Sequence, residues 1–519
     1  MQSATLTPGA ARSPRPARAR ALPARLRGGG ASGALLARIG FGVLVLGGLI
    51  AFVAFPTYPT YDSFYALLWG RELLHGHVPD LAVYRAPTEH PLAIAFGAFC
   101  SLFGASGARL MIAGAIASFV ALVAGMYRLG TAAFGPVVGW LAALLMLTRF
   151  FDENLTVQGY LDISYLALIV WALALEVARP RRGPLVFVLL AGAGLLRPDA
   201  WVLSGVYWLW CVWPRRDAEG MDNRKRLAYL GLALLAPVIW VIFDAALTGD
   251  PLHSLHQTTE LAGELERTQG ISGVLGSMWS FAVRIDKLPV VLGVLAGVVI
   301  GVLLTPRRAL VPLATLLILL GVFLAEGALG ASVINRYLLG AATVALLFAA
   351  LALGGWSMLE RGSRLRIAWM AAAALLVVYG TANVLSTFHV SELSNTMAYH
   401  EDFHEGLAHA LANTRVKRTL ARCHVLSLPD NKLVPDARWI LASSPTDIVA
   451  RSQARSEAAA GRSALAERLA HGSVAVYPLG PAVFFEAIVD PGDDPRDQVP
   501  EAGYSRIYTS HYYSIYANC

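Results

Sequence analysis

The chain has 519 residues, of which 56% are hydrophobic and 15% charged, and its mean hydropathy is +0.54. This balance excludes a soluble globular protein, and the long apolar runs exclude an outer-membrane barrel, whose strands alternate over roughly ten residues. The net charge of +7 comes from short basic segments between apolar runs, without a basic and aromatic binding module, which argues against a nucleic-acid partner. The composition predicts an all-α polytopic membrane bundle.

The chain begins with a segment of low sequence complexity. Residues 1–33 are rich in Ala, Pro, Arg and Gly and predict a disordered basic tail. The apolar run at 35–56 is too long for a signal-peptide core, so it predicts an uncleaved first span. Arginines before it place the N-terminus in the cytoplasm by the positive-inside rule.

Eleven spans are predicted in all. The short apolar segment 91–103 begins with His-Pro and is typical of a re-entrant or interfacial helix. If it does not cross, all four basic connections at 178–183, 214–226, 306–308 and 360–366 fall on the cytoplasmic side. The predicted spans are 35–56, 106–127, 135–148, 161–178, 184–196, 200–213, 227–247, 288–304, 309–331, 337–358 and 367–388.

This topology divides the chain into the tail 1–33, a transmembrane domain at 34–388, and an extracytoplasmic C-terminal domain at 389–519. Loops 57–105, 149–160, 248–287 and 332–336 share the outer side. In the C-terminal domain "SALAERLAHG" predicts a helix, whereas "SVAVYPL", "AVFFEAIV" and "YSRIYTSHYYSIYA" predict strands of a small α/β or α+β fold. Cys423 and Cys519 could pair there, outside the cytosol. The expected location is the plasma (inner) membrane.

Polar residues gather directly after the first span. Asp62 could be a general base at the membrane surface, or the N-cap of an amphipathic helix "YDSFYALLWGRELLHG" that ends at Gly76. Glu89 and His90 lie between Pro87 and Pro91 on a stiffened backbone. That suits a site, and it also suits a turn that enters a membrane helix.

Further polar residues stand at outer ends of spans, where charges usually face the bundle interior. Asp162 could be a second carboxylate or an acid that complements the helix dipole. Arg197, followed by Asp199, could bind a phosphate bidentately or pair with its neighbour. Arg336 with Tyr337 repeats this arrangement, and it could equally be an interface anchor.

The loop 248–287 raises the question of a metal. His253, His256, Glu260 and Glu264 follow the spacing i, i+3, i+7, i+11 on one helix face. They lack the HExxH pattern, so a solvated helix face is favoured and no metal ligand is assigned.

The combination of these motifs resembles the GT-C superfamily of membrane glycosyltransferases, especially the protein-mannosyltransferase-like glycosyltransferase family 39. Asp62 stands at the position of the family's first-loop acid, and "EHPL" is similar to its "HPPL" motif. "GARLMI", "YLDISYLAL", "LLRPDAW" and "NRYLLGAATVALLFAALAL" resemble further family segments. The resemblance covers about 40–390. A single acid at Asp62 and leucine at position 92 depart from the pattern.

The resemblance implies a hexosyl- or pentosyltransferase that uses a polyprenyl-phosphate sugar and inverts the anomeric centre. The acceptor would be a cell-envelope glycan, lipid or protein on the outer face. Asp62 would be the base, with Asp162 orienting the acceptor or the base. The resemblance assigns no cofactor, and a divalent cation stays open. The expected substrate-binding residues are Arg85, Glu89, His90, Arg197, Asp199, Arg336 and Tyr337.

Two other classes of function remain. A transporter would place ionisable residues near the bilayer midplane and often shows repeated halves, and the sequence has neither feature. A non-catalytic scaffold with a partner-binding outer domain is the second alternative.

Overall fold

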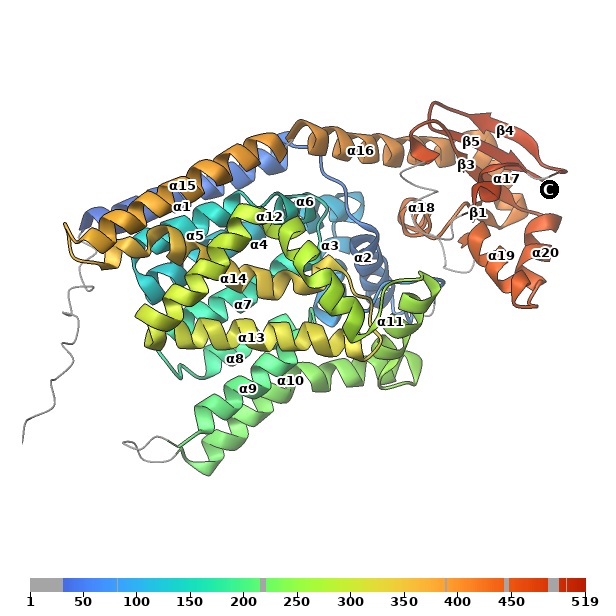
Figure 1. Cartoon of the computed structure of the whole chain (residues 1–519). Helices are drawn as coiled ribbons and strands as arrows, with labels where there is room; N and C mark the ends of the chain where they lie inside the picture. The colour runs from blue at the N-terminus through green and yellow to red at the C-terminus, as the bar shows by residue number, and fades with distance from the viewer. Residues whose placement is uncertain are drawn as a thin grey trace, which may run out of the picture.

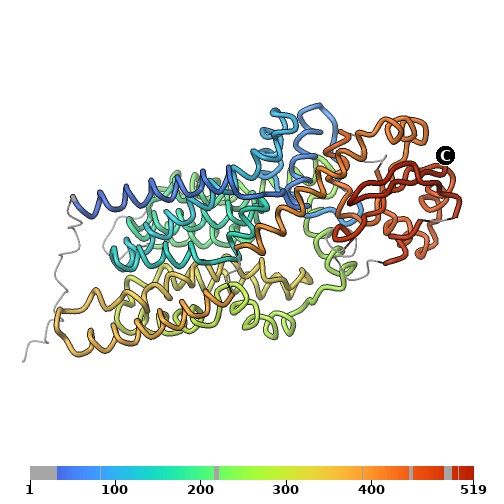
Figure 2. The backbone as a smooth tube through the Cα atoms, turned by 90° about the horizontal axis from the view of Figure 1, so that it is seen from above, coloured from blue at the N-terminus to red at the C-terminus, as the bar shows by residue number. Residues whose placement is uncertain are grey.

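The computed structural model describes residues 31–81, 83–214, 221–387, 390–442, 448–483, 494–500 and 502–519. Most helices of the bundle run along one direction, and the C-terminal domain sits at one end of them (Figures 1 and 2). The chain enters the bundle at the opposite end, where α1 begins at Ala31. The predicted tail otherwise lies outside the described residues.

The membrane bundle is helical throughout its described part. Its elements, in chain order, are α1 (Ala31–Ala54), α2 (Tyr61–Leu74), α3 (Pro91–Ser101), η2 (Gly104–Ser106), α4 (Gly107–Phe134), α5 (Pro136–Leu147), α6 (Phe150–Val157), α7 (Leu161–Ala178), α8 (Pro184–Gly194), α9 (Asp199–Val212), α10 (Asn223–Thr248), α11 (His253–Glu264), α12 (Gly270–Leu304), α13 (Pro306–Ala328), η3 (Asn335–Leu338), α14 (Leu339–Gly354), η4 (Gly355–Met358) and α15 (Arg364–Thr387).

The prediction of a polytopic helical bundle is confirmed, whereas the count of eleven spans is not. Within the described residues, eight helices are long and apolar enough to cross a membrane. The three other predicted spans coincide with the shorter helices α5, α8 and α9. The described parts of all four basic connections lie at the end away from the C-terminal domain, as their shared side required (Figure 1).

Helix α14 forms the centre of the bundle. Its residues are small or apolar on every face, and nearly all are buried. It packs against α12, α13 and α5. A Cβ on Gly297 of α12 would lie 1.8 Å from the Phe348 carbonyl oxygen, so only glycine permits this approach. Close packing at α14 fixes Arg336, which precedes it, relative to the rest of the bundle.

Helices α2 and α3 build the end of the bundle that faces the C-terminal domain. Their backbones are in direct contact at Gly70, where a Cβ would lie 2.2 Å from the Ala98 nitrogen, so only glycine fits there. Thr60, not Asp62, is the N-cap of α2, since its hydroxyl accepts from the amides of residues 62 and 63. Asp62 is therefore left in the first turn with its carboxylate available, and a negative charge is favourable there.

The C-terminal domain is a mixed α/β fold, as predicted. Its strand order is β2-β1-β3-β5-β4, in which β1 pairs in parallel with β2 and β3, and β5 pairs antiparallel with β3 and β4. Its elements are α16 (Val390–Ala412), α17 (Thr414–Cys423), β1 (Leu426–Leu428), α18 (Val434–Leu441), β2 (Ile448–Ala450), α19 (Arg451–Ala459), α20 (Ala464–His471), β3 (Val474–Pro478), η6 (Pro495–Gln498), β4 (Ser505–Thr509) and β5 (Tyr513–Ala517).

Most of the sequence patterns in this domain are found in the structure. The predicted helix is α20, and two predicted strand segments are β3 and the β4–β5 hairpin. The third, "AVFFEAIV", falls almost wholly outside the described residues. Cys423 and Cys519 form a disulfide with a Cα–Cα distance of 5.9 Å, which ties the chain end to α17.

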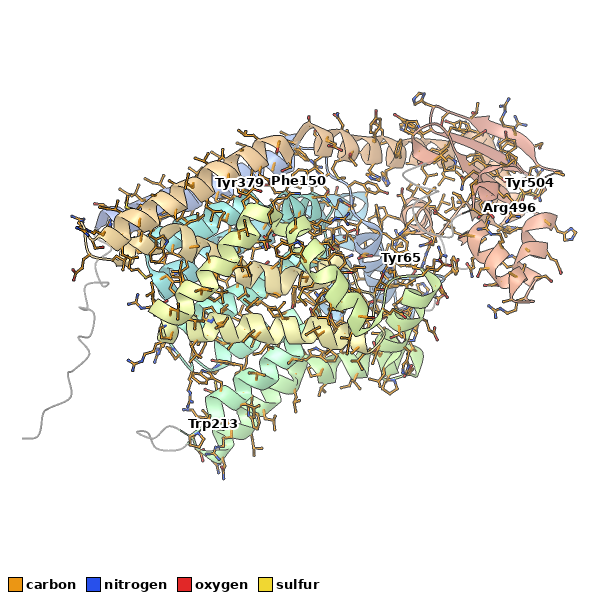
Figure 3. All side chains as sticks on the ribbon, in the orientation of Figure 1. Tyr65, Phe150, Trp213, Tyr379, Arg496 and Tyr504 are labelled. Atoms are coloured by element: carbon orange, nitrogen blue, oxygen red, sulfur yellow. A yellow bond between two sulfur atoms is a disulfide. The ribbon has the colours of Figure 1, made fainter. Side chains whose placement is uncertain are left out.

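A buried ion pair joins the two domains. The guanidinium of Arg438 on α18 lies 2.6 Å from the Glu72 carboxylate on α2, and its side chain is fully buried. Arg71 donates to the carbonyls of Arg438 and Trp439. Tyr65, labelled in Figure 3, lies at this junction, under the Arg438 guanidinium. The helix that the sequence predicted as amphipathic is thus covered on both sides.

Removing one partner of this pair should weaken the junction. Glu72→Gln leaves the Arg438 charge buried without a carboxylate, which costs about 3 kcal/mol or more. We expect faster cleavage of the C-terminal domain in limited proteolysis and a lower Tm. The exposed acid Glu401 on α16 provides the control Glu401→Gln, which should behave as wild type. Equal proteolysis rates in both variants would show that the pair does not hold the domains together.

Candidate functional site

A cavity of about 470 Å3 lies at the end of the bundle, beneath the C-terminal domain. Its walls come from the start of α2, the loop before α3, the ends of α9, α10 and α13, helix α11 and η3. Two residues of the C-terminal domain, Asn431 and Lys432, complete the lining. Five basic and four acidic side chains line it, so its charge is nearly balanced.

Arg336 links the two acids that the sequence predicted as catalytic. Its guanidinium lies 2.8 Å from the Asp162 carboxylate and 3.1 Å from that of Asp62. Asp162 is almost completely buried, whereas Asp62 is 23% exposed and lines the cavity. Asp62 is therefore open to the cavity, whereas Asp162 is enclosed and contacts Arg336.

Arg197 makes the second contact to Asp162, at 2.8 Å, and pairs with Asp199 at 3.1 Å. Its guanidinium lies over the ring of Tyr337, 4.8 Å from the centroid. The structure thus brings together residues from α2, α7, the α8–α9 turn and η3, which are far apart in the sequence. Two fixed guanidinium groups at a cavity wall can bind an anionic oxygen bidentately.

His90 lines the cavity, whereas Glu89, its neighbour in the sequence, lies behind the lining. Glu89 is buried, and its Oε1 lies 3.1 Å from Nε2 of His253. Burial raises the pKa of Glu89 to about 7 and lowers the pKa of His90 to about 4. His90 packs edge-on against Trp240 and is neutral near pH 7. The part of the lining that His90 forms is therefore uncharged near pH 7.

The helix face predicted in the loop 248–287 does not act as one cluster. His253 turns towards Glu89, and His256 lies 2.7 Å from Asp250. Glu260 and Glu264 are exposed. Helix α11 itself lines the cavity, through Ser254 and Thr258 among others.

Several polar lining residues were not predicted from the sequence, among them Glu326, Asn431 and Lys432. Glu326 lies near the end of α13 and contacts Asp199, and the signal for it was an acid inside an apolar span. Asn431 donates to the Tyr61 hydroxyl, and Lys432 lies over the ring of the same tyrosine. No pattern in the sequence connects these two to the bundle. The predicted Arg85 lines the cavity as well.

Arg109, which stands in one of the motifs of the resemblance, has a different place. It donates to the Thr57 hydroxyl and to the Phe52 carbonyl, both at 2.6 Å, and does not line the cavity. It secures the end of α1 against α4.

No family model and no curated protein matches the chain. Among solved structures, it is similar to an apo oligosaccharyltransferase of Archaeoglobus fulgidus, with 14% identity over 93% of this chain and 74% of that chain and a TM-score of 0.47. It is also similar to ArnT from Cupriavidus metallidurans in the apo state, with 13% identity over 94% and 98% and a TM-score of 0.47.

A third match is archaeal oligosaccharyltransferase AglB from Archaeoglobus fulgidus in complex with an inhibitory peptide and a dolichol-phosphate. Its identity is 14% over 92% of this chain and 74% of that chain, with a TM-score of 0.48. Similarity at this level establishes no shared function, so function must come from the residues of this chain.

Proposed function

We propose that the protein is an integral-membrane glycosyltransferase that moves a sugar from a polyprenyl-phosphate donor to a cell-envelope acceptor on the outer face. The observation that carries the proposal is a carboxylate, Asp62, and two guanidinium groups, Arg197 and Arg336, held together at a cavity where the bundle ends. A lipid carrier reaches such a place from the bilayer, and a polar acceptor reaches it from water.

The reaction follows from these groups. The acceptor hydroxyl attacks the anomeric carbon while its proton passes to the Asp62 carboxylate. The bond from the anomeric carbon to the lipid phosphate breaks on the opposite face, and the electron pair leaves with the phosphate. Arg197 and Arg336 stabilise the negative charge that develops on that oxygen. Attack opposite to the leaving group inverts the anomeric centre.

The remaining residues have supporting roles in this proposal. Asp162 positions both arginines and, through Arg336, the base. Glu89 and His90 shape the wall that receives the sugar, and Tyr337, Asp199 and Arg85 complete the donor side. The disulfide between Cys423 and Cys519 suits an oxidising compartment, which supports an extracytoplasmic C-terminal domain.

A transporter and a non-catalytic scaffold would each require a different arrangement of these residues. A transporter needs its ionisable residues where the substrate crosses, near the midplane. The acids and arginines described above lie instead at the end of the bundle next to the C-terminal domain. A scaffold needs no aligned base and phosphate-binding groups, so it does not account for the arrangement.

The first test is binding of a polyprenyl monophosphate to purified protein. Arg197→Gln and Arg336→Gln should each weaken binding roughly tenfold or more, because each removes a charge-assisted hydrogen bond. Arg109→Gln is the matched control, since Arg109 is structural and lies outside the cavity. Binding that is unchanged in both cavity variants would exclude this phosphate assignment and favour the scaffold.

The second test distinguishes the proposed role of Asp62 as base from that of Asp162, which positions the two arginines. Asp62→Asn should reduce sugar transfer about 10²-fold to 10⁴-fold while donor binding stays close to wild type. Asp162→Asn should reduce both, because Arg197 and Arg336 lose their shared counter-ion. Transfer is measured with radiolabelled hexosyl and pentosyl polyprenyl phosphates and membranes as acceptor. Full sugar transfer by a variant that carries both Asp62→Asn and Asp162→Asn would refute the mechanism.

Glu89 should give the site a pH-dependent stability. A free glutamate titrates near 4.5, and the pKa of Glu89 in the folded protein is about 7. As pH rises between these values the unfolded chain releases this proton while the folded chain retains it, so stability falls. The loss is complete above about pH 7 and amounts to about 3 kcal/mol at most.

The measurement is Tm against pH for wild type and Glu89→Gln. The wild-type Tm should fall relative to the variant between about pH 5 and about pH 8. Parallel curves would mean that His253 holds Glu89 ionised in the folded state.

A further inference from the structure

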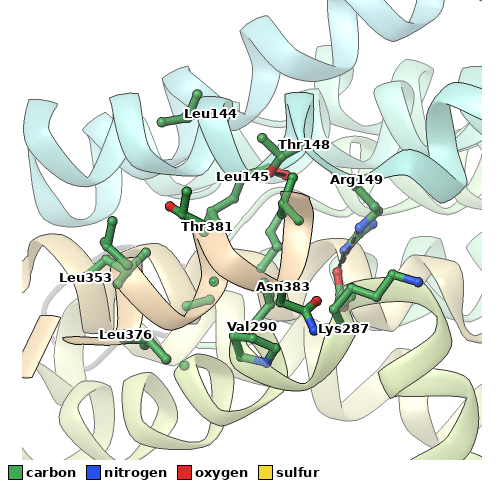
Figure 4. Close-up of a pocket in the computed structure, with 18 of the residues that line it drawn as sticks. Leu144, Leu145, Thr148, Arg149, Lys287, Val290, Leu353, Leu376, Thr381 and Asn383 are labelled. Atoms are coloured by element: carbon green, nitrogen blue, oxygen red, sulfur yellow. Dashed lines mark hydrogen bonds and ion pairs between the residues drawn. The ribbon is translucent and has the colours of Figure 1, made fainter. Parts of the chain in front are cut away.

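A second cavity, of about 380 Å3, lies between α5, α12, α14 and α15. It shares no lining residue with the cavity described above. Figure 4 shows that its two ends differ: Leu353 and Leu376 lie at one end, and Arg149, Lys287 and Asn383 lie at the other. The cavity therefore has an apolar body and a polar mouth.

The apolar body is open to the side of the bundle. Leu144 of α5 and Val377 of α15 are exposed although they line it. Gly380 leaves space as well, because the nearest atom to a Cβ there is 3.9 Å away. In a membrane, an opening of this kind faces hydrocarbon chains rather than water.

The polar mouth lies where α12 changes direction. Lys287 has φ 63° and ψ 154° between two helical halves, and Pro289 follows it. A straight helix of 35 residues would span about 52 Å, more than the ~30 Å hydrocarbon core. The second half, residues 288–304, has about 17 residues, the lower end of the range that crosses a membrane, so we infer that the break at Lys287 lies near the membrane edge. Helix α15, which carries Asn383, ends at Thr387 in the direction of the C-terminal domain (Figure 1).

The charges at the mouth are not equivalent. Arg149 is buried and held by Asp286 at 2.6 Å, by Asp152 at 3.3 Å and by the Thr343 hydroxyl at 2.8 Å. Lys287 is half-buried, and within the described part of the chain no carboxylate forms an ion pair with it. The Asn383 side-chain oxygen is buried there without a hydrogen-bond partner. The available charge at the mouth is thus the positive ammonium of Lys287.

We propose that this second cavity binds one anionic glycerophospholipid of the surrounding leaflet, with an acyl chain in the apolar body and the phosphate at Lys287. The lateral opening admits a chain directly from the bilayer. The ammonium at the membrane edge matches the depth and sign of the headgroup. A polyprenyl carrier that reacts at the first cavity would not lie here, because the two cavities share no lining residue. The site is independent of the proposed transferase activity.

The test is native mass spectrometry of the full chain in detergent, titrated with dioleoyl phosphatidylglycerol. Dioleoyl phosphatidylcholine and a polyprenyl monophosphate are the comparison lipids. Lys287→Gln should weaken phosphatidylglycerol binding about fivefold, the order expected for one basic residue at a headgroup. Gly380→Leu should abolish it, because the side chain fills the apolar body.

Matched controls are Arg284→Gln, an exposed cation on the same helix, and Gly321→Leu, a helical glycine with open space around it outside the cavity. Both should bind as wild type, and size-exclusion profiles verify that all variants fold. Equal binding of the two glycerophospholipids, or binding indifferent to Lys287→Gln or to Gly380→Leu, would overturn the proposal in favour of non-specific boundary lipid. Displacement of phosphatidylglycerol by the polyprenyl phosphate in Arg336→Gln, whose first cavity has lost a phosphate contact, would overturn the assignment of the occupant.

Discussion

The site depends on one buried carboxylate. Asp162 is 1% exposed and accepts from both Arg197 and Arg336. A charge buried at this depth is tolerated only with partners that compensate it, and two guanidinium groups satisfy both of its oxygens. Since each arginine also contacts a second acid, Asp199 or Asp62, the position of Asp162 determines the geometry of the whole wall.

That wall is rigid because the helices that carry it approach closely. The contact at Gly70 and Gly97 brings α2 against α3, and the contact at Gly297 brings α12 against α14. Side chains at these points would force the backbones apart by several ångströms. Preorganised charges need such rigidity, because groups that must reorient during a reaction contribute less to transition-state stabilisation.

The sequence contained enough information to predict the class of fold and to propose the charged residues that meet at one wall of the cavity. Long apolar runs and basic connections predicted a multi-pass bundle, and ionisable residues at span ends predicted Asp62, Asp162, Arg197 and Arg336. Short apolar helices such as α5 and α8 cannot be assigned as crossing from length alone. The interpretation of Asp62 as the N-cap of α2 is wrong, because Thr60 and Asp62 are both good caps and only the backbone geometry decides between them.

Contacts between segments that are distant in the sequence could not be predicted. Arg438 and Lys432 reach the bundle from a domain whose own pattern indicates only strands and helices. Local periodicity reports which face of an element is apolar, but not which partner covers it. Glu326 was detectable as a lone acid in a span, yet its proximity to Asp199 follows only from how α13 packs.

The placement of Asn431 and Lys432 has a consequence for the making of the protein. All of the bundle precedes residue 390, so it leaves the ribosome before the segment that closes the cavity has been translated. Chains fold from their N-terminal parts first. A nascent chain therefore carries Asp62 and Arg336 without this cover, and the cavity acquires its last wall only when α18 docks against α2 and brings Asn431 and Lys432 with it. The cavity is thus closed only after the segment that carries Asn431 and Lys432 has been synthesised.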